Sequence, residues 1–491
     1  MIDLGLDLIF WCTLYVVLLL VIGSMGRQAR KDESLRDYFL AGRTMGPIVL
    51  LLTFFATQYS GNSLSGFPGQ TYRQGLSYFM SVTFMIGIVA GYTLFAPRLY
   101  AASRRKNFLT PTDFLKDRFR SPLLNDLSAA IFAWALLNFL LAQFIALGNA
   151  FESFTQGEIP YWAAVVVGAV VVLIYVIVGG MRAVAWTDAL QGILLVVGLV
   201  LIVILIWVEV GSPTSVARTV QLLNPEMVSN PTLTECLVWL SHFVLLALGA
   251  PLYPQALQRI YAAQRLRHLR NSLATMAVIP LFAVSIVIFI GAAGLALFPQ
   301  LDRLETEQVT FRVVSYLVES NTLAYYPALA VMMAVVAAIM STADSCLLTL
   351  SSIFTKDFVA RIKHLKDDQV EQLRRWVPLI SIAVMTFVVI LAIGPRMTLW
   401  GLLIIKFEIL IQLSPAFIFG TLHTREDPRA FVVQDIVPGL VSGLVVTLAL
   451  YLGGYLLAVD SLFGLHFGTV GVLANYAVVV GHRWWRLRGG E

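Results

Sequence analysis

Charged residues are scarce in this chain. They make up 13% of its 491 residues, whereas about 25% is usual for soluble proteins. No polar stretch is long enough to form a soluble domain, and the basic residues are scattered, which argues against nucleic acid as a partner. Apolar runs of about 20 residues recur instead from end to end. The composition predicts an all-α polytopic membrane protein, because the strands of a membrane barrel alternate in polarity over only about 10 residues.

Cysteine and recognisable catalytic motifs are equally sparse. The three cysteines, Cys12, Cys236 and Cys346, lie in or near apolar runs without the spacing of a metal site or a disulfide framework. The chain also lacks a glycine-rich phosphate-binding loop of the Walker type. We therefore expect neither an enzyme nor a pump that is driven by ATP.

Thirteen apolar segments are each long enough to cross a lipid bilayer. When lysine and arginine are assigned to alternate loops, 28 of the 34 fall on one side, five fall on the other and Lys406 lies inside a span. The side that is richer in positive charge faces the cytoplasm. This predicts a bacterial-type cytoplasmic membrane protein with its N-terminus outside and its C-terminus in the cytoplasm. The predicted spans are 7–26, 45–66, 75–97, 127–151, 160–180, 184–210, 235–256, 272–298, 324–358, 375–394, 397–421, 431–455 and 462–482.

The second predicted span changes character at its midpoint. Its apolar residues continue to Phe55, and polar or flexible residues then dominate the stretch 57–63. These residue types are poor helix formers, so the pattern indicates a discontinuous helix. Unwinding frees backbone carbonyls, which a bound cation or solute can satisfy near the bilayer midplane. The alternative is a close-packed face of small residues. The residues concerned are Thr57, Gln58, Ser60, Gly61, Asn62 and Ser63.

The ninth predicted span carries hydroxyl groups on one face. At 3.6 residues per turn, Ala338, Ser341, Thr342 and Ser345 lie on the same side of a helix, beside the carboxylate of Asp344. Hydroxyl and carbonyl oxygens are suitable ligands for a hard alkali cation. Serine and threonine in membrane helices also bond to preceding carbonyls or to a neighbouring helix, which is the structural alternative.

Three further polar positions stand out within apolar segments. Asp188 lies one turn into the sixth span, where it caps the helix or guides a cation. Tyr253 and Gln255 flank a proline that bends or breaks the seventh span. Either their side chains face a cavity, or the proline only produces a kink. Lys406 in the eleventh span either attracts an anionic substrate or neutralises a carboxylate such as Glu408 or Asp344.

Four motifs in this order resemble the sodium:solute symporter family. They are Asp-Tyr-Phe-Leu-Ala-Gly-Arg at 37–43, the broken second span, the segment 179–191 and Ser-Thr-Ala-Asp-Ser at 341–345. The resemblance covers essentially the whole chain. It implies a single transporter domain, 1–491, with a leucine-transporter-type core of two inverted five-helix repeats at 45–210 and 235–421. The segment 1–44 adds an N-terminal span and a loop, and 422–491 adds two spans and a basic tail.

The resemblance also implies which residues bind the ion. A sodium ion would be held by the carbonyls of Ala56, Tyr59 and Ala338 and by the hydroxyls of Ser341 and Thr342, in agreement with the one-face pattern. Asp188 and Ser345 would belong to a second cation site or an ion path. One position departs from the family: proline-type members carry an aspartate where this chain has Gln58, which disfavours proline as the substrate.

We therefore expect a sodium-coupled symporter that imports a small organic solute by alternating access, working as a monomer in the lipid bilayer. Lys406 and Gln58 favour a solute with a free carboxylate. Two alternatives stay open: a membrane sensor, for which we would expect an output domain that the sequence does not predict, and a proton-coupled symporter that uses Asp188 or Asp344. The candidate substrate residues are Gln58, Ser60, Gly61, Asn62, Tyr253, Gln255 and Lys406.

Overall fold

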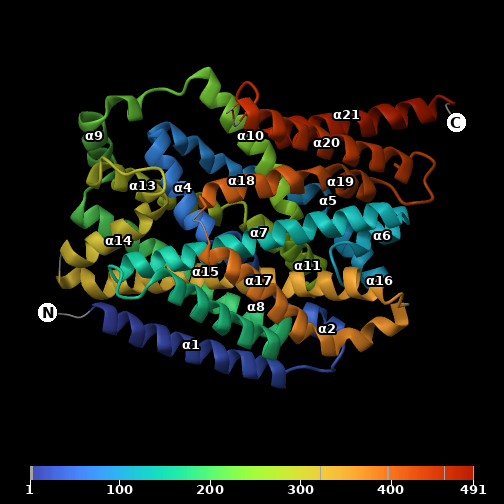
Figure 1. Cartoon of the computed structure of the whole chain (residues 1–491), viewed down its shortest axis with the longest axis horizontal. Coiled ribbons are helices and arrows are strands. Elements are labelled where there is room, and N and C mark those ends of the chain that lie inside the picture. The colour runs from blue at the N-terminus through green and yellow to red at the C-terminus, as the bar shows by residue number, and fades with distance from the viewer. Residues whose placement is uncertain are drawn as a thin grey trace.

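A computed structural model describes residues 4–320, 322–365, 367–394, 397–457, 459 and 461–489. Within these ranges the chain is built from helices and contains no β-strand. In Figure 1, α1 and the α20–α21 pair lie at opposite edges of the molecule. The α-helices are α1 Leu4–Gln28, α2 Leu35–Leu40, α3 Pro47–Gln58, α4 Gly61–Gln74, α5 Phe84–Lys106, α6 Asp113–Phe119, α7 Pro122–Phe154, α8 Tyr161–Glu209, α9 Pro213–Leu223, α10 Leu233–Gly249, α11 Pro254–Ala262, α12 Leu266–Thr275, α13 Ile279–Leu297, α14 Val309–Ser320, α15 Tyr325–Ile353, α16 Ala360–Ile362, α17 Val377–Ile393, α18 Leu399–Leu410, α19 Ser414–Leu422, α20 Val433–Leu457 and α21 Phe467–Leu487.

The described residues include 10 helical segments that are long and apolar enough to cross a membrane. The chain is therefore a multi-pass membrane protein, as predicted. Three differences account for the thirteen predicted spans. The second predicted span consists of two shorter helices, α3 and α4, and α8 contains both the fifth and the sixth predicted spans. Helix α21 is not among the ten. The count of thirteen stays a prediction.

Helix α8 consists of two segments that meet at Gly180. A straight helix of its 49 residues would extend about 73 Å, far beyond a hydrocarbon core of about 30 Å. Gly180 has a φ of 61°, and a Cβ at this position would lie 2.8 Å from the carbonyl oxygen of Tyr38. Tyr175 and Thr187, on opposite sides of Gly180, both donate to the carboxylate of Asp344. The chain therefore turns back on itself at Gly180, between the predicted spans 160–180 and 184–210.

The predicted break in the second span is present between α3 and α4. Helix α3 ends at Gln58, and Tyr59 and Ser60 have extended backbone angles before α4 begins. The amide of Gly61, which has lost its helical partner, donates to Oε1 of Gln143 on α7 at 2.9 Å. The sequence change at residue 57 thus coincides with a backbone break that α7 stabilises.

A second break separates α10 from α11. A short 3₁₀ turn follows Gly249, and Tyr253 leads into α11. The far ends of the two broken helices meet through the backbone: Met45, before α3, donates to the carbonyl of Ala262 at 3.2 Å and accepts from the amide of Gln264 at 3.0 Å. Two half-helices that are distant in sequence are thus joined by main-chain hydrogen bonds.

Helix α15 lies at the centre of the molecule. The span Tyr325–Ile362 contains α15, and 94% of its most apolar stretch is buried inside the protein. The corresponding share for the span that contains α1 is 22%. Helix α15 packs against α7 and α8, and α1 covers α8 from outside. The polar residues of α15 are therefore enclosed by protein and not by lipid.

Candidate functional site

Four oxygen atoms from α3 and α15 converge where the second span is broken. The hydroxyl of Ser341 lies 3.1 Å from the carbonyl oxygen of Ala56 and 2.9 Å from that of Ala338, and the hydroxyl of Thr342 lies 3.4 Å from the latter. In a continuous helix the Ala56 carbonyl would accept the amide of Ser60, but that amide donates to Ser63 Oγ at 3.4 Å. The break therefore releases this carbonyl.

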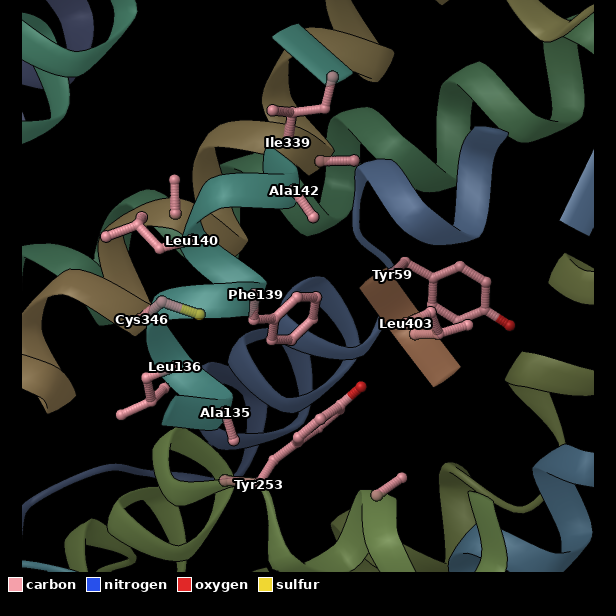
Figure 2. Close-up of a cluster of buried hydrophobic side chains, with 14 of the residues drawn as sticks. Tyr59, Ala135, Leu136, Phe139, Leu140, Ala142, Tyr253, Ile339, Cys346 and Leu403 are labelled. Atoms are coloured by element: carbon pink, nitrogen blue, oxygen red, sulfur yellow. The ribbon is translucent and has the colours of Figure 1, made fainter. Parts of the chain in front are cut away.

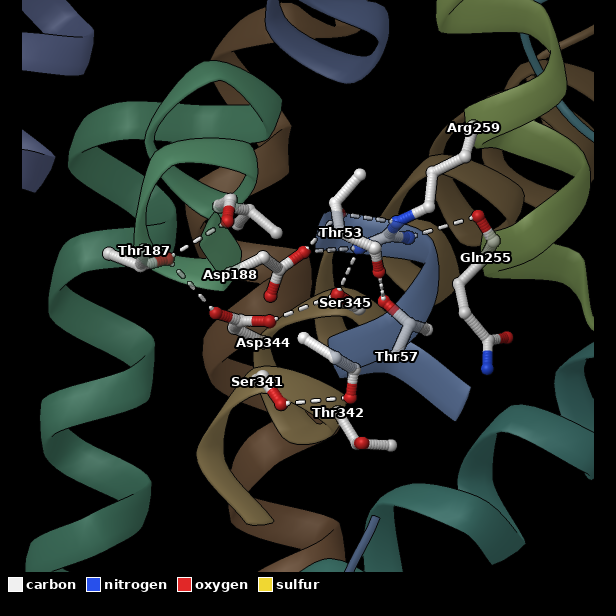
Figure 3. A network of polar contacts seen from close by, with 12 residues as sticks. Thr53, Thr57, Thr187, Asp188, Gln255, Arg259, Ser341, Thr342, Asp344 and Ser345 are labelled. Carbon is white, nitrogen blue, oxygen red and sulfur yellow. Dashed lines mark hydrogen bonds and ion pairs between the residues drawn. The ribbon is translucent and has the colours of Figure 1, made fainter. Parts of the chain in front are cut away.

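This group contains four of the five predicted sodium ligands, and their binding of sodium stays a prediction. Ser341 and Thr342 are fully buried, and the Tyr59 carbonyl lies at the break itself. Carbonyl and hydroxyl oxygens are hard, neutral ligands, which suit a monovalent cation that must bind and leave. Figure 3 shows Ser341 and Thr342 together on α15, one turn from Asp344 and Ser345. The arrangement fits a sodium ion, and its occupancy stays a prediction.

The second predicted cation position contains a buried ion pair. Asp188 Oδ2 accepts from Arg259 Nη2 at 2.6 Å, and both side chains are fully enclosed. Thr53 also donates to Asp188. The same Nη2 atom lies 2.5 Å from Ser345 Oγ. A guanidinium group from α11 thus bonds both residues that the sequence assigned to a second cation.

Arg259 is a candidate functional residue that the sequence analysis did not identify. Its Nε donates to Thr53 at 2.7 Å and its Nη1 to the carbonyl of Gln255 at 3.0 Å, so the side chain joins α3, α8, α11 and α15 (Figure 3). In the sequence it lies between the predicted spans 235–256 and 272–298, among the positive charges of a loop on the cytoplasmic side. The signal that could have identified it is its place five residues after Pro254, within a helix that restarts after a break.

Asp344 has a different environment from Asp188. It accepts hydrogen bonds from the hydroxyls of Tyr175 at 2.8 Å, Ser345 at 3.0 Å and Thr187 at 3.4 Å. Asp344 is fully buried, and within the described ranges it forms no ion pair. The alternative in which Lys406 neutralises Asp344 is therefore not found among the described residues.

A cavity adjoins the break in α3–α4. Gln58, Tyr59, Ser60 and Tyr253 line it, together with apolar and aromatic side chains of α5, α13 and α18. Gln58 Nε2 donates to the hydroxyl of Tyr92 at 2.9 Å. Of the candidate substrate residues, the cavity thus brings together Gln58, Ser60 and Tyr253.

The remaining candidates lie away from the cavity wall. Gly61 is occupied by Gln143, as described above. Asn62 and Gln255 are buried, and the oxygen and nitrogen atoms of both side-chain amides lack a hydrogen-bond partner among the described residues. Buried amides almost always have partners, so these two are candidates for contact with a bound ligand.

Lys406 lies behind the cavity in an aromatic enclosure. It is fully buried, and its Nζ atom lies 3.4 Å from the ring centre of Phe139, 4.7 Å from Tyr253 and 5.0 Å from Phe407. Tyr253 and Phe407 also line the cavity, so their rings separate it from the amine. Figure 2 shows Phe139 and Tyr253 facing each other in this cluster. Aromatic faces attract a cation but satisfy none of its hydrogen bonds.

Glu408 does not neutralise Lys406. Tyr451 donates to its carboxylate, and the amide of Gly468 donates at 3.2 Å. The structural alternative for Lys406, a pair with a neighbouring carboxylate, is thus wrong for Glu408 as well. Lys406 Nζ has no hydrogen-bond partner among the residues that the structure describes.

The motif at 37–43 precedes α3 and is held by contacts to α8 and to the end of α5. Asp37 pairs with Arg182 at 2.8 Å. Arg43 donates to the carbonyls of Ser103 and Phe108, both at 2.8 Å, and burial lowers the pKa of Arg43 to about 10. None of these contacts involves the oxygen cluster around Ser341 and Thr342.

A family profile described as the sodium:solute symporter family matches residues 38–424. The chain belongs to this family. It is 26% identical over 489 residues to the sodium/pantothenate symporter of Escherichia coli strain K12, an alignment that covers 97% of this chain and 96% of that protein. It is 27% identical over 362 residues to the sodium/proline symporter of Staphylococcus aureus strain JH9, covering 71% and 67%.

A solved structure of a Na⁺-coupled sialic acid symporter, in a substrate-bound outward-open state, has a TM-score of 0.76 to this chain. The two are 18% identical, and the match covers 99% of this chain and 98% of the other. This likeness confirms the leucine-transporter-type fold. As a sodium:solute symporter, the chain is a transporter and not an enzyme, and sodium is its co-transported ion with a small organic solute.

Proposed function

We propose that this symporter imports a small solute that carries a carboxylate group. The observation that carries the proposal is Lys406: a fully buried amine with no hydrogen-bond partner in the described part of the chain. A charge in this environment is costly unless an opposite charge joins it. A substrate carboxylate would supply that charge once the Tyr253 ring moves aside. Pantothenate and proline, which the curated relatives carry, both bear a carboxylate.

Other residues would complete the substrate and sodium sites. Gln58 and Ser60 would bind the solute from the cavity wall. The side-chain amides of Asn62 and Gln255, which lack a hydrogen-bond partner among the described residues, would form hydrogen bonds with it. Sodium would bind between Ala56, Tyr59, Ala338, Ser341 and Thr342 and hold α3 against α15. Because sodium would order the broken helix, it would raise the affinity for the solute, and the solute would raise the affinity for sodium equally. The outward N-terminus, the cytoplasmic C-terminus and a monomeric working unit remain part of the proposal.

The test is uptake into proteoliposomes with an imposed sodium gradient. Labelled proline, pantothenate, acetate, lactate, pyruvate, sialic acid and glucose form the panel, and a potassium gradient is the control. We expect one carboxylate solute to accumulate with sodium only. Sodium-driven uptake of glucose, with none of the carboxylates transported, would contradict the proposal.

A proton-coupled mechanism is a second candidate, and Asp344 is the observation that favours it. This carboxylate is buried and forms no ion pair with the described residues, so a proton would remove an uncompensated buried charge. Uptake driven by a pH gradient in the absence of sodium would support this mechanism. Uptake that ignores the pH gradient would leave sodium as the coupling ion.

A further inference from the structure

We propose that a cavity at one end of α15 binds the headgroup of a membrane phospholipid that carries both a phosphate and an ammonium group with N–H bonds, the chemistry of phosphatidylethanolamine. The cavity has a volume of about 590 Å³. It lies between α6, the start of α7 and the residues that continue α15, at the end of the molecule where Figure 1 shows α6 and α16. The proposed orientation places this end at the cytoplasmic surface. The inference concerns a lipid and is independent of which solute is transported.

Basic side chains line this cavity. They are Lys116, Arg120, Lys356 and Arg361. Lys356 pairs with Asp113 at 2.6 Å, and Arg361 pairs with Asp126. Arg120 is exposed and forms no ion pair with the described residues. Arginine and lysine bind phosphate oxygens through charge-assisted hydrogen bonds, and basic pockets between membrane helices on the cytoplasmic side bind lipid headgroups.

The N-terminal end of α7 also borders the cavity. Ser121 caps this helix by accepting from the amide of Leu124 at 3.2 Å, and Pro122 is the first residue of the helix. Ser121 and Pro122 both line the cavity. Because a helix N-terminus carries a partial positive charge, it favours a phosphate at this position in addition to the basic side chains.

Two buried acceptor atoms call for a second group beside the phosphate. Asp357 lines the cavity and is 9% exposed; its Oδ1 accepts from Thr112 at 2.8 Å, whereas its Oδ2 has no partner among the described residues. The side-chain oxygen of Asn125, also in the lining, lacks a partner there as well. Buried carboxylate and amide oxygens almost always accept hydrogen bonds. A bare phosphate would repel Asp357, but a neighbouring ammonium group with three N–H bonds would satisfy both acceptors.

Exposed apolar side chains favour a lipid over a soluble phosphate ester. Leu123 and Ile362 are 52% and 75% exposed, and each directly follows a residue of the cavity lining. Lipid tails are as apolar as leucine, so these side chains are suitable neighbours for them. The cavity is thus bordered by surface that suits the acyl chains of the same lipid molecule.

The residues that continue α15 connect this cavity to the transport machinery. Phe354–Val359, which includes Lys356 and Asp357, is a π-helical segment directly after α15. π-helical turns are rare and occur frequently at functional sites. Since α15 also carries Ser341 and Thr342, a lipid bound at Asp357 would hold the end of the helix that bears the predicted sodium ligands.

The first test measures lipid binding to the purified, delipidated protein by native mass spectrometry. Phosphatidylethanolamine is compared with phosphatidylcholine, which has no N–H bond, and with phosphatidylglycerol, which has no ammonium group, all with identical acyl chains. We expect one phosphatidylethanolamine molecule to bind about tenfold more tightly than either of the others. Equal binding of phosphatidylcholine would overturn the recognition of the ammonium group. Equally tight binding of glycerophosphoethanolamine, which has no acyl chains, would overturn the assignment to a lipid.

The second test assigns this binding to the cavity. Asp357→Asn keeps the size of the side chain but removes its charge, and we expect it to abolish the preference for phosphatidylethanolamine over phosphatidylcholine. Arg120→Gln removes a cation and should weaken the binding of all three lipids about tenfold. Arg105→Gln is the matched control, because Arg105 is an exposed arginine in the last turn of α5, outside the cavity lining.

A folded Asp357→Asn protein that keeps its lipid preference would overturn the proposal. If Asp357→Asn does not fold, Arg120→Gln decides, and unchanged lipid binding by that variant would overturn the proposal equally. Neither measurement uses transport, so the outcome is separate from that of the uptake experiment.

Discussion

Two groups of oxygen atoms lie one helical turn apart on α15, and their neighbours differ. The group around Ser341 and Thr342 consists of neutral carbonyl and hydroxyl oxygens beside a broken helix. The group around Ser345 includes the Asp188 carboxylate and a guanidinium. The neutral group is suited to an ion that arrives from solution and leaves again, whereas the charged group is already neutralised. A buried carboxylate in a membrane protein therefore indicates an ion site only when no cationic side chain of the protein already neutralises it.

The largest effect is expected when the charged group is unbalanced. Asp188→Asn removes the carboxylate that bonds Arg259 directly, which should destabilise the protein by about 3–5 kcal/mol. The measurement is thermal unfolding of the purified protein in detergent. The double variant Asp188→Asn with Arg259→Gln removes both charges and should recover most of the stability. If the single variant is as stable as the unaltered protein, the ion pair is not what holds these helices together.

The neutral group should respond through sodium affinity. Ser341→Ala and Thr342→Ala each remove one ligand, and we expect each to raise the sodium concentration for half-maximal uptake about tenfold, or ~1.4 kcal/mol. Expression and unfolding temperature should change little. Ser351→Ala is the control on the same helix, because its hydroxyl lies 2.8 Å from Ser381 Oγ and outside the cluster. Unchanged sodium dependence in both site variants would contradict the assignment.

Substitution of Lys406 should affect the binding of the solute without affecting either of the two oxygen groups on α15. Lys406→Met should raise the KM for a carboxylate solute about tenfold, because a charge-assisted contact is lost. Its stability should stay equal or increase, since an unpaired buried amine is removed. Lys363→Met, on an exposed lysine, is the control. A destabilised variant with an unchanged KM would show that Lys406 is structural.

The smallest effect is expected at the edge of the charged group. Tyr175→Phe removes one hydroxyl donor from Asp344, and the two remaining donors limit the loss to about 1 kcal/mol. The unfolding temperature should fall slightly, with no change in half-saturation by sodium. A change in sodium half-saturation as large as that of Ser341→Ala would instead join Asp344 to the sodium site.

The sequence was sufficient for features that depend on local spacing. Polar residues at 57–63 predict the break, and the 3.6-residue repeat places Ser341 and Thr342 on one face, as the structure has them. Contacts between helices that are distant in the sequence could not be predicted from local spacing. Arg259 has the same appearance in the sequence as any arginine near a helix end, and its partner Asp188 lies 71 residues away. The enclosure of Lys406 by three aromatic rings, with no hydrogen-bond partner among the described residues, likewise depends on contacts between helices.

The main-chain hydrogen bonds at Met45 have a consequence for how the transporter opens. They join the start of α3 to the residues after α11 without any side chain, so no substitution that keeps the backbone intact can weaken them directly. The two half-helices therefore form one mechanical unit. When the protein releases its cargo, this unit either swings as a whole or exchanges two backbone bonds, worth about 1 kcal/mol each, for water. Side-chain substitutions can therefore alter the solute site, whereas the connection between α3 and α11 depends on the backbone alone.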